Sequence, residues 1–282
     1  MKSYQLGLYE KSMPNSLTFS QKLKITKKSG FDFLELSVDE TDEKLKRLDY
    51  TIEEINKMRH HMEKEDVFIQ SICLSGHRKY PLGSEDPNVQ EQSLEIMRKA
   101  IVFAHRLGVR YIQIAGYDEY YKTSNKQTQI NFLKNLELSV KIASTYGVVL
   151  AFETMETPFM NTVAKAMKYV NYVQSPYLKV YPDIGNLTNA AEHNPQDVII
   201  DLRSGKGHIV AAHLKETKPN IYRNLMFGKG HTNYQACLKE LMSQNVFLFV
   251  AEFWHNDKKN WRNNISKAYE FLKEEIEGAM NS

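Results

Sequence analysis

The chain has 282 residues, a length typical of one α/β barrel and long for two small domains. Its composition, 42% hydrophobic and 25% charged, excludes a disordered or fibrous protein. The 37 Lys and Arg residues nearly balance the 34 Asp and Glu residues, and a net charge of +3 argues against nucleic-acid binding. We therefore expect a single domain over residues 1–282.

The cysteines and the N-terminus bear on the compartment of the protein. Cys73 and Cys237 stand in apolar stretches without metal-binding spacing, which predicts buried thiols rather than a disulfide or a zinc ribbon. The N-terminus lacks an apolar run followed by a cleavage site, and no run of about 18 apolar residues occurs. These features predict a cytoplasmic protein that does not bind membranes.

A repeated pattern along the chain predicts a helix followed by a buried strand. An amphipathic stretch, a glycine and a short β-branched or aromatic run recur around Gly30, Gly108 and Gly147. Each glycine can adopt the left-handed conformation that ends a helix, and each following run is apolar enough to be buried on both faces. Helices alternating with parallel strands are the simplest interpretation.

Extending this pattern predicts eight strands, the number that closes a (β/α)8 barrel. In chain order they span residues 4–9, 31–37, 67–74, 110–116, 148–153, 178–183, 208–215 and 246–252. Helical patterns fill the intervals, as in 52–64, which follows the N-cap candidate Thr51, and in 90–107. The alternative, an open doubly wound sheet, lacks support because no GxGxxG turn follows the first strand.

Four polar residues stand where the predicted strands end, which is where barrel enzymes carry their active residues. Glu153, Asp183 and Glu252 end strands five, six and eight, and His213 lies in strand seven. They are separated by roughly 30 to 40 residues, about one strand-helix unit. Because neighbouring strands lie about 4.8 Å apart, the four side chains can reach one point over the barrel mouth.

This set predicts one divalent metal ion. A single acidic residue after a strand is more often a helix cap, and a single histidine in a strand is more often a hydrogen-bonded core residue. Three carboxylates at the ends of hydrophobic strands, however, repel one another unless a cation or a proton neutralises them. One imidazole with several carboxylates suits Mn²⁺, Mg²⁺ or Zn²⁺ with positions open for a substrate.

Such a site can move a proton. Glu153 and Glu252 come from strands that are not adjacent, so they can approach a substrate from opposite sides. A metal that holds a ketone oxygen and the neighbouring hydroxyl favours the enediolate formed when one glutamate removes a carbon-bound proton. Return of a proton to the other face of that carbon is epimerisation, and return to the adjacent carbon is aldose–ketose isomerisation.

The stretches that carry these residues resemble one known family. LAFETMETPFMNT, KVYPDIGNLTNA, AAHLKET and FVAEFWHN are similar to stretches of the L-ribulose-5-phosphate 3-epimerases, also called L-xylulose-5-phosphate 3-epimerases, which are xylose-isomerase-like TIM barrels. The resemblance runs nearly end to end. It implies metal ligation by Glu153, Asp183, His213 and Glu252, with Zn²⁺ or Mn²⁺ foremost and Mg²⁺ or Co²⁺ as further candidates. It also implies that Glu153 and Glu252 form the acid/base pair.

The same resemblance implies the substrate and the biological setting. The expected substrate is a ketopentose 5-phosphate that is inverted at C3, in pentose or L-ascorbate breakdown, and the expected assembly is a homodimer. A phosphate needs cations or backbone amides. The loop ETKPNIYRNLMFGKGH and the lysine directly before it offer Lys215, Arg223 and Lys229, of which Arg223 is preferred, and His77 with Arg78 is a second candidate.

Further residues are candidates for contact with the sugar. Glu156 follows Glu153 by three residues, and Trp254 and His255 follow strand eight, so each can border the site. Related epimerases of unphosphorylated ketoses carry a histidine where this chain has Asn186, which can still donate a hydrogen bond. Three residues near other strand ends are expected to line the open half of the pocket, without assigned roles: Tyr9, Glu35 and Gln113.

Three alternatives to a 3-epimerase follow from the same residues. An aldose–ketose isomerase acting on a sugar phosphate such as a hexulose 6-phosphate would use the same four ligands. A metal-dependent endonuclease generally needs more metals and a basic groove. A non-catalytic sugar-phosphate sensor would be expected to lack a ligand, and all four are present.

Overall fold

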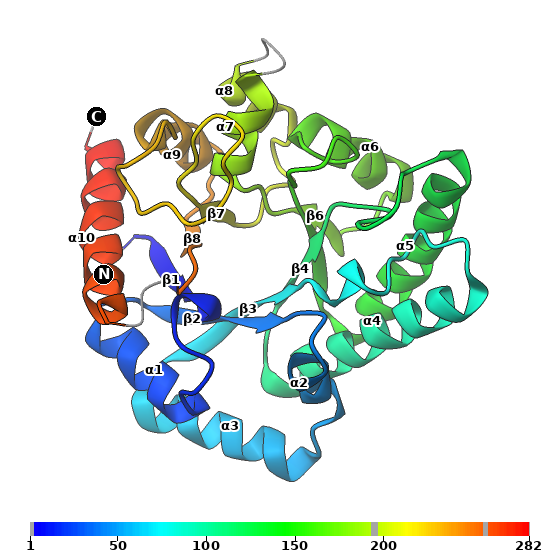
Figure 1. The fold of residues 1–282 in the computed structure, drawn as a ribbon, viewed down its shortest axis with the longest axis horizontal. Helices are drawn as coiled ribbons and strands as arrows, with labels where there is room; N and C mark the ends of the chain where they lie inside the picture. The colour runs from blue at the N-terminus through cyan, green and yellow to red at the C-terminus, as the bar shows by residue number, and fades with distance from the viewer. Residues whose placement is uncertain (1–2, 193–196, 256–258, 282) are drawn as a thin grey trace.

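The fold is a closed barrel of eight parallel strands surrounded by helices, as predicted (Figure 1). The computed structural model describes residues 3–192, 197–255 and 259–281. The strands are β1 (Gln5–Tyr9), β2 (Phe33–Val38), β3 (Phe68–Leu74), β4 (Tyr111–Ala115), β5 (Val149–Glu153), β6 (Leu178–Val180), β7 (Ala212–Leu214) and β8 (Leu248–Ala251).

Helices connect successive strands and form the outer layer (Figure 1). They are α1 (Phe19–Lys28), α2 (Asp42–Leu45), α3 (Ile52–Glu65), α4 (Pro87–Leu107), α5 (Lys126–Tyr146), α6 (Val163–Val173), α7 (Ile184–Glu192), α8 (Val198–Ser204), α9 (Tyr234–Ser243) and α10 (Trp261–Met280). Three short 3-10 turns join them: η1 (Glu10–Ser12), η2 (Lys46–Asp49) and η3 (Gly76–Arg78). Among the described helices, none is both long and apolar enough to cross a membrane.

Parallel pairing runs through the whole sheet in the order β6-β5-β4-β3-β2-β1-β8-β7. Two isolated parallel bridges, Val180 to Ile209 and Asp183 to His213, join the two ends of this order and close the barrel. All strands are parallel, so their carboxyl ends open at one rim. The closing seam brings the segment after β6 beside β7.

Several local predictions are confirmed, and some boundaries differ. Gly30, Gly108 and Gly147 have φ values of 88°, 82° and 69°, the left-handed conformation that ends α1, α4 and α5. Helix α4 begins at Pro87, earlier than the predicted 90, because proline at the first helical position needs no hydrogen bond. Strand β6 is shorter than predicted, since Pro182 has no N–H for the ladder and the chain turns into α7.

Most of the core lies in two clusters of buried residues. One apolar cluster fills the space between the barrel and the helices, and a smaller one fills the barrel interior, where Phe33, Tyr181 and Val250 pack together. Cys73 and Cys237 are free thiols buried in these clusters, as predicted. The barrel is therefore a packed core with a rim above it, not a pore.

A buried charge cluster fixes the turn that follows β1. The Glu10 carboxylate is fully buried and accepts hydrogen bonds from Lys22 at 2.7 Å, Lys44 at 3.0 Å and Arg47 at 2.6 Å. It also accepts one from the backbone N–H of Ser37. Burial alone would raise the pKa of Glu10, but the Arg47 guanidinium and the two ammonium groups hold it well below its usual range. The cluster ties η1 to α1, α2, η2 and β2.

Replacing Glu10 tests how much of the stability this cluster carries. We expect Glu10→Gln to lower the free energy of unfolding at pH 7 by about 3–5 kcal/mol, because two buried ammonium groups and the partly buried Arg47 guanidinium lose the carboxylate that they share. Urea denaturation followed by circular dichroism measures the change. Glu95→Gln is the control, because the Glu95–Arg98 pair is partly exposed and should change stability by less than about 1 kcal/mol. Equal effects of the two substitutions would contradict the role given to Glu10.

Candidate metal centre

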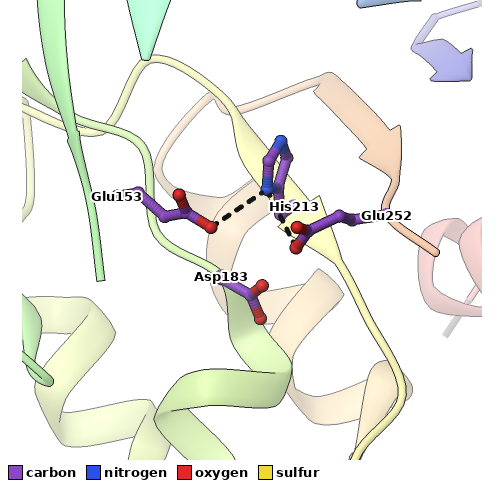
Figure 2. A group of neighbouring side chains, drawn as sticks. All are labelled: Glu153, Asp183, His213 and Glu252. Carbon is purple, nitrogen blue, oxygen red and sulfur yellow. Dashed lines mark ion pairs between the residues drawn. The ribbon is translucent and has the colours of Figure 1, made fainter. Parts of the chain in front are cut away.

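Four side chains converge at the rim of the barrel. Glu153 ends β5, His213 lies in the middle of β7, Glu252 directly follows β8, and Asp183 lies between β6 and α7. All four are buried, and one ligand atom from each lies within 4.8 Å of the others. Figure 2 shows the four side chains pointing toward one another. The structure thus brings together the four residues selected from the sequence.

The dimensions of this group fit one cation. Bonds of about 2.0–2.2 Å place opposite ligand atoms of one metal ion about 4.0–4.4 Å apart, close to the observed spread. Asp183 Oδ2 and Glu252 Oε2 are buried and have ion-pair contacts with Lys215 or His213, but they accept no hydrogen bond from the described residues, which is uncommon for buried carboxylates. Three carboxylates and one imidazole therefore form a donor set that a divalent cation can complete.

Asp183 both caps a helix and faces the cluster. Its Oδ1 atom accepts a hydrogen bond of 2.8 Å from the backbone N–H of Asn186, in the first turn of α7. Its backbone N–H donates to Thr154 Oγ1 at 3.0 Å. These contacts hold the carboxylate in place and leave Oδ2 toward the other ligands. From the sequence, an acidic residue after a strand could be a helix cap or a metal ligand. Asp183 is placed for both roles, because its Oδ1 caps α7 and its Oδ2 faces the cluster.

The His213 ring is held from behind by Glu35. His213 Nε2 lies 2.6 Å from Glu35 Oε1, whereas Nδ1 lies 3.2 Å from Glu252 Oε2 and 3.5 Å from Glu153 Oε1. The Gln113 side-chain amide contacts the same ring, 3.0 Å from Nδ1. A carboxylate that accepts the proton of one ring nitrogen sets the tautomer and turns the other nitrogen toward the ligands. Nδ1 is therefore the candidate ligand atom.

Glu35 is itself tightly positioned. Its second carboxylate oxygen, Oε2, accepts hydrogen bonds from Ser71 Oγ at 2.6 Å and from the Tyr181 hydroxyl at 3.0 Å. Glu35 and Gln113 thus lie behind His213, and neither lines the cavity, contrary to the expectation from the sequence. A signal for Glu35 was present, since a carboxylate inside the otherwise apolar strand FDFLELS must find a partner when buried.

The electrostatics of the four groups are strongly coupled. Burial raises the pKa of Glu153 and of Asp183, and the nearby Glu252 carboxylate adds to this. Burial also acts to raise the pKa of Glu252, but the Lys215 ammonium and the His213 imidazole lower it overall. Like charges this close need a cation among them, which supports the fit of a metal ion.

Lys215 lies in the cluster rather than in the loop with which the sequence grouped it. Its ammonium is 3.1 Å from Asp183 Oδ2 and 3.5 Å from Glu252 Oε2, and it donates a hydrogen bond of 2.9 Å to Asn186 Oδ1. The sequence held a signal for this placement. Lys215 follows His213 by two positions, and side chains two apart in a strand point to the same side.

A small cavity opens above the cluster. It is lined by Tyr9, Lys11, Cys73, Ser75, Arg78, Ala115, Glu153, Met155, Glu156, Lys215, Arg223, Glu252 and Trp254. Its free space of about 20 Å³ holds roughly one water molecule. Glu156 and Arg223 pair across the cavity at 3.1 Å, and Tyr120 donates to Glu156 at 3.3 Å.

Some candidates for substrate contact lie elsewhere. His77 is buried with Nε2 3.1 Å from the Ser93 carbonyl oxygen, and burial lowers the pKa of this imidazole to about 4. Lys229 is exposed, and neither residue lines the cavity. Asn186 is buried beside Asp183, and its amide donates to the Thr154 carbonyl oxygen at 2.8 Å. As candidates for contact with the phosphate, Arg78 is therefore better placed than His77, and Arg223 is better placed than Lys229.

The chain is similar in sequence to known sugar epimerases. Residues 23–275 match the family described as xylose isomerase-like TIM barrel. The chain is 43% identical over 274 residues to L-ribulose-5-phosphate 3-epimerase UlaE of Escherichia coli (strain SMS-3-5 / SECEC), covering 96% of this chain and 95% of that protein. It is 42% identical over 280 residues to the protein of the same name from Salmonella heidelberg (strain SL476), covering 99% and 97%.

Solved structures agree on the fold. D-psicose 3-epimerase with D-tagatose from Clostridium cellulolyticum H10 has a TM-score of 0.80 at 16% identity, covering 96% of this chain and 99% of that chain. A structure of L-ribulose 3-epimerase has a TM-score of 0.77 at 16% identity, covering 99% and 96%. At these identities the similarity shows a shared barrel.

The contact between Glu35 and His213 can be tested through metal affinity. We expect Glu35→Gln to weaken binding of Mn²⁺ or Zn²⁺ to the metal-free protein by about 10- to 100-fold, because the imidazole loses its orienting carboxylate. Isothermal titration calorimetry measures the affinity. Tyr181→Phe is the matched control, since it removes one hydrogen bond to Glu35 and leaves the carboxylate, and it should have a much smaller effect. Wild-type affinity in Glu35→Gln would refute the assigned role.

Proposed function

Because this chain belongs to the L-ribulose-5-phosphate 3-epimerase family of the xylose isomerase-like TIM barrels, we propose that it interconverts L-ribulose 5-phosphate and L-xylulose 5-phosphate by inverting C3. The observation that carries the proposal is the convergence of Glu153, Asp183, His213 and Glu252 at one point of the rim. The identity of 43% over 96% of the chain supports the choice of substrate.

The proposed cofactor is one divalent metal ion, with Zn²⁺ or Mn²⁺ foremost because the donor set mixes one imidazole with carboxylates. When bound, it would supply a Lewis acid for the ketone and hydroxyl oxygens of the sugar. The chain provides the orientation of the ligands. Glu35 fixes the ring of His213, and the first turn of α7 fixes Asp183.

Glu153 and Glu252 are the proposed acid/base pair. They lie on opposite sides of the cluster, and both line the cavity (Figure 2). One glutamate removes the proton from C3, and the electron pair of the broken C–H bond moves toward the ketone. The other glutamate then delivers a proton to the opposite face of C3, which inverts that carbon. In the reverse direction the two residues exchange roles.

Arg78 is the best-placed cation for the phosphate. It lines the cavity, its guanidinium lies 5.0 Å from the Tyr120 ring centre, and its buried Nε donates no hydrogen bond to a described residue. Arg223 also lines the cavity but is already paired with Glu156. A guanidinium with a free donor suits the oxygens of a phosphate. We therefore propose Arg78 as the main phosphate contact and Arg223 as a secondary one.

We further propose that the enzyme is cytoplasmic, forms a homodimer and acts in the breakdown of pentoses or L-ascorbate. The buried free thiols of Cys73 and Cys237 support a reducing compartment. The names of the relatives support the class of sugar. The homodimer stays a prediction from the family resemblance, and sedimentation velocity tests it.

The acid/base pair is tested by isotope exchange and by two substitutions. Incubation of L-ribulose 5-phosphate with the metal-loaded protein in deuterated water should give L-xylulose 5-phosphate labelled at C3, as detected by NMR. We expect Glu153→Gln and Glu252→Gln to lower kcat by about 10²- to 10⁴-fold, since each removes a proton-transfer group. The surface variant Glu95→Gln should keep wild-type kcat. Unlabelled product, or full activity in either active-site variant, would exclude this mechanism.

The phosphate contact is tested by comparing two substrates. We expect Arg78→Met to raise KM for L-ribulose 5-phosphate by about 10- to 100-fold, the value of a charge-assisted hydrogen bond. Turnover of unphosphorylated L-ribulose should change little. Lys229→Met, in an exposed loop, is the control and should leave both values unaltered. If Arg78→Met impaired both substrates equally, Arg78 would not be the phosphate contact.

A further inference from the structure

Lys215 is a buried cation that the proposed mechanism does not yet use. Only 4% of the residue is exposed, yet it lines the cavity above the cluster. Its ammonium lies 3.1 Å from Asp183 Oδ2 and 3.5 Å from Glu252 Oε2. It therefore borders the space in which the oxygens of a bound sugar must lie.

The position of the Lys215 ammonium lowers the affinity that the cluster would have for a metal ion. An ammonium this close to two ligand atoms repels a divalent cation held by the same atoms. Moving a lysine out of water also costs free energy unless its N–H groups find partners. A site selected only for affinity toward a metal ion would gain from an apolar residue here. The position of Lys215 thus points to a second negatively charged partner.

Asn186 fixes the direction of this ammonium. The Asn186 amide donates to the Thr154 carbonyl oxygen at 2.8 Å, so its Oδ1 atom is turned toward Lys215 and accepts a hydrogen bond of 2.9 Å. The Asn186 backbone N–H also contacts Asp183 Oδ1 at 2.8 Å. The Trp254 ring centre lies 5.3 Å from the ammonium, a distance typical of a cation–π contact. An ammonium has three donors, and this arrangement leaves donors directed at the ligands and the cavity.

We propose that Lys215 is a further catalytic residue that donates a hydrogen bond to the ketone oxygen of the substrate, and that Asn186 is its positioning residue. This inference rests on the proposed function. When the C3–H bond breaks, its electron pair moves into the C2–C3 bond and the ketone oxygen gains negative charge. The hydrogen bond from Lys215 strengthens at that moment and weakens when C3 is reprotonated. No proton leaves the ammonium, and Lys215 stabilises the charge that develops.

The main experiment separates this role from a role in holding the metal site together. Lys215→Met removes the charge and keeps a side chain of similar length. We expect its affinity for Mn²⁺, measured by calorimetry on metal-free protein, to equal or exceed that of the wild type. At saturating Mn²⁺ we expect kcat for L-ribulose 5-phosphate to fall by about 10²- to 10³-fold, as for loss of one oxyanion donor, with a smaller change in KM. Lys215→Arg should recover part of kcat.

Matched variants sharpen the result. Lys179→Met changes a half-buried lysine of β6 that contacts His208 and does not line the cavity, and it should keep wild-type kcat and Mn²⁺ affinity. Asn186→Ala should lower kcat less than Lys215→Met, and the double variant should be no slower than Lys215→Met alone, because Asn186 acts through Lys215. Unchanged kcat in Lys215→Met would overturn the proposal. A fall in kcat that only follows a loss of Mn²⁺ affinity would overturn it too.

A second readout does not depend on the identity of the sugar. Acetohydroxamate carries a negative charge and two oxygens on neighbouring atoms, as an enediolate does. We expect Lys215→Met to weaken its binding to the Mn²⁺-loaded protein at least tenfold. If the wild type failed to turn over L-ribulose 5-phosphate, the proposed function would fail, and acetohydroxamate binding would still decide the role of Lys215. Equal affinity in wild type and variant would then refute it.

Discussion

Repulsion among three carboxylates buried beside one imidazole constrains the arrangement of side chains at the rim of the barrel. Glu153, Asp183 and Glu252 place ligand atoms within 4.8 Å of one another and of His213. A protein does not hold such groups together without compensation. Glu35, Thr154 and Asn186 restrain the ligands, and Lys215 supplies positive charge.

The restraint comes from the fold itself. The bridge between Asp183 and His213 closes the barrel at the place where two ligands must meet. Glu35 holds His213 from behind, and the first turn of α7 holds Asp183. Because the ligand side chains are already held in place, they lose little conformational freedom when a cation and a sugar bind. This is the physical basis of preorganised catalysis. The charge cluster around Glu10 fixes the turn after β1 in a similar way.

The cations around the cavity can contact different parts of the proposed substrate. Lys215 contacts the ligands, whereas Arg78 and Arg223 line the same cavity beside Tyr120 and Glu156 respectively. A ketose phosphate develops charge at its ketone and carries permanent charge at its phosphate. One cation in contact with the ligands and two others that are not paired with them match this pattern, so rate and affinity can depend on different residues.

The amino-acid sequence alone predicted the alternation of strands and helices and pointed to the four residues at the strand ends, because strand and helix periodicity and glycine positions are local signals. It also carried the family resemblance. Only the folded chain shows that Glu35 contacts His213 across 178 positions, that Lys215 points into the cluster and that His77 does not line the cavity. These outcomes depend on barrel closure, strand register and the direction of each side chain. Such properties arise from contacts between distant segments, so a local signal, such as the spacing of Lys215 from His213, cannot name the partner of a side chain.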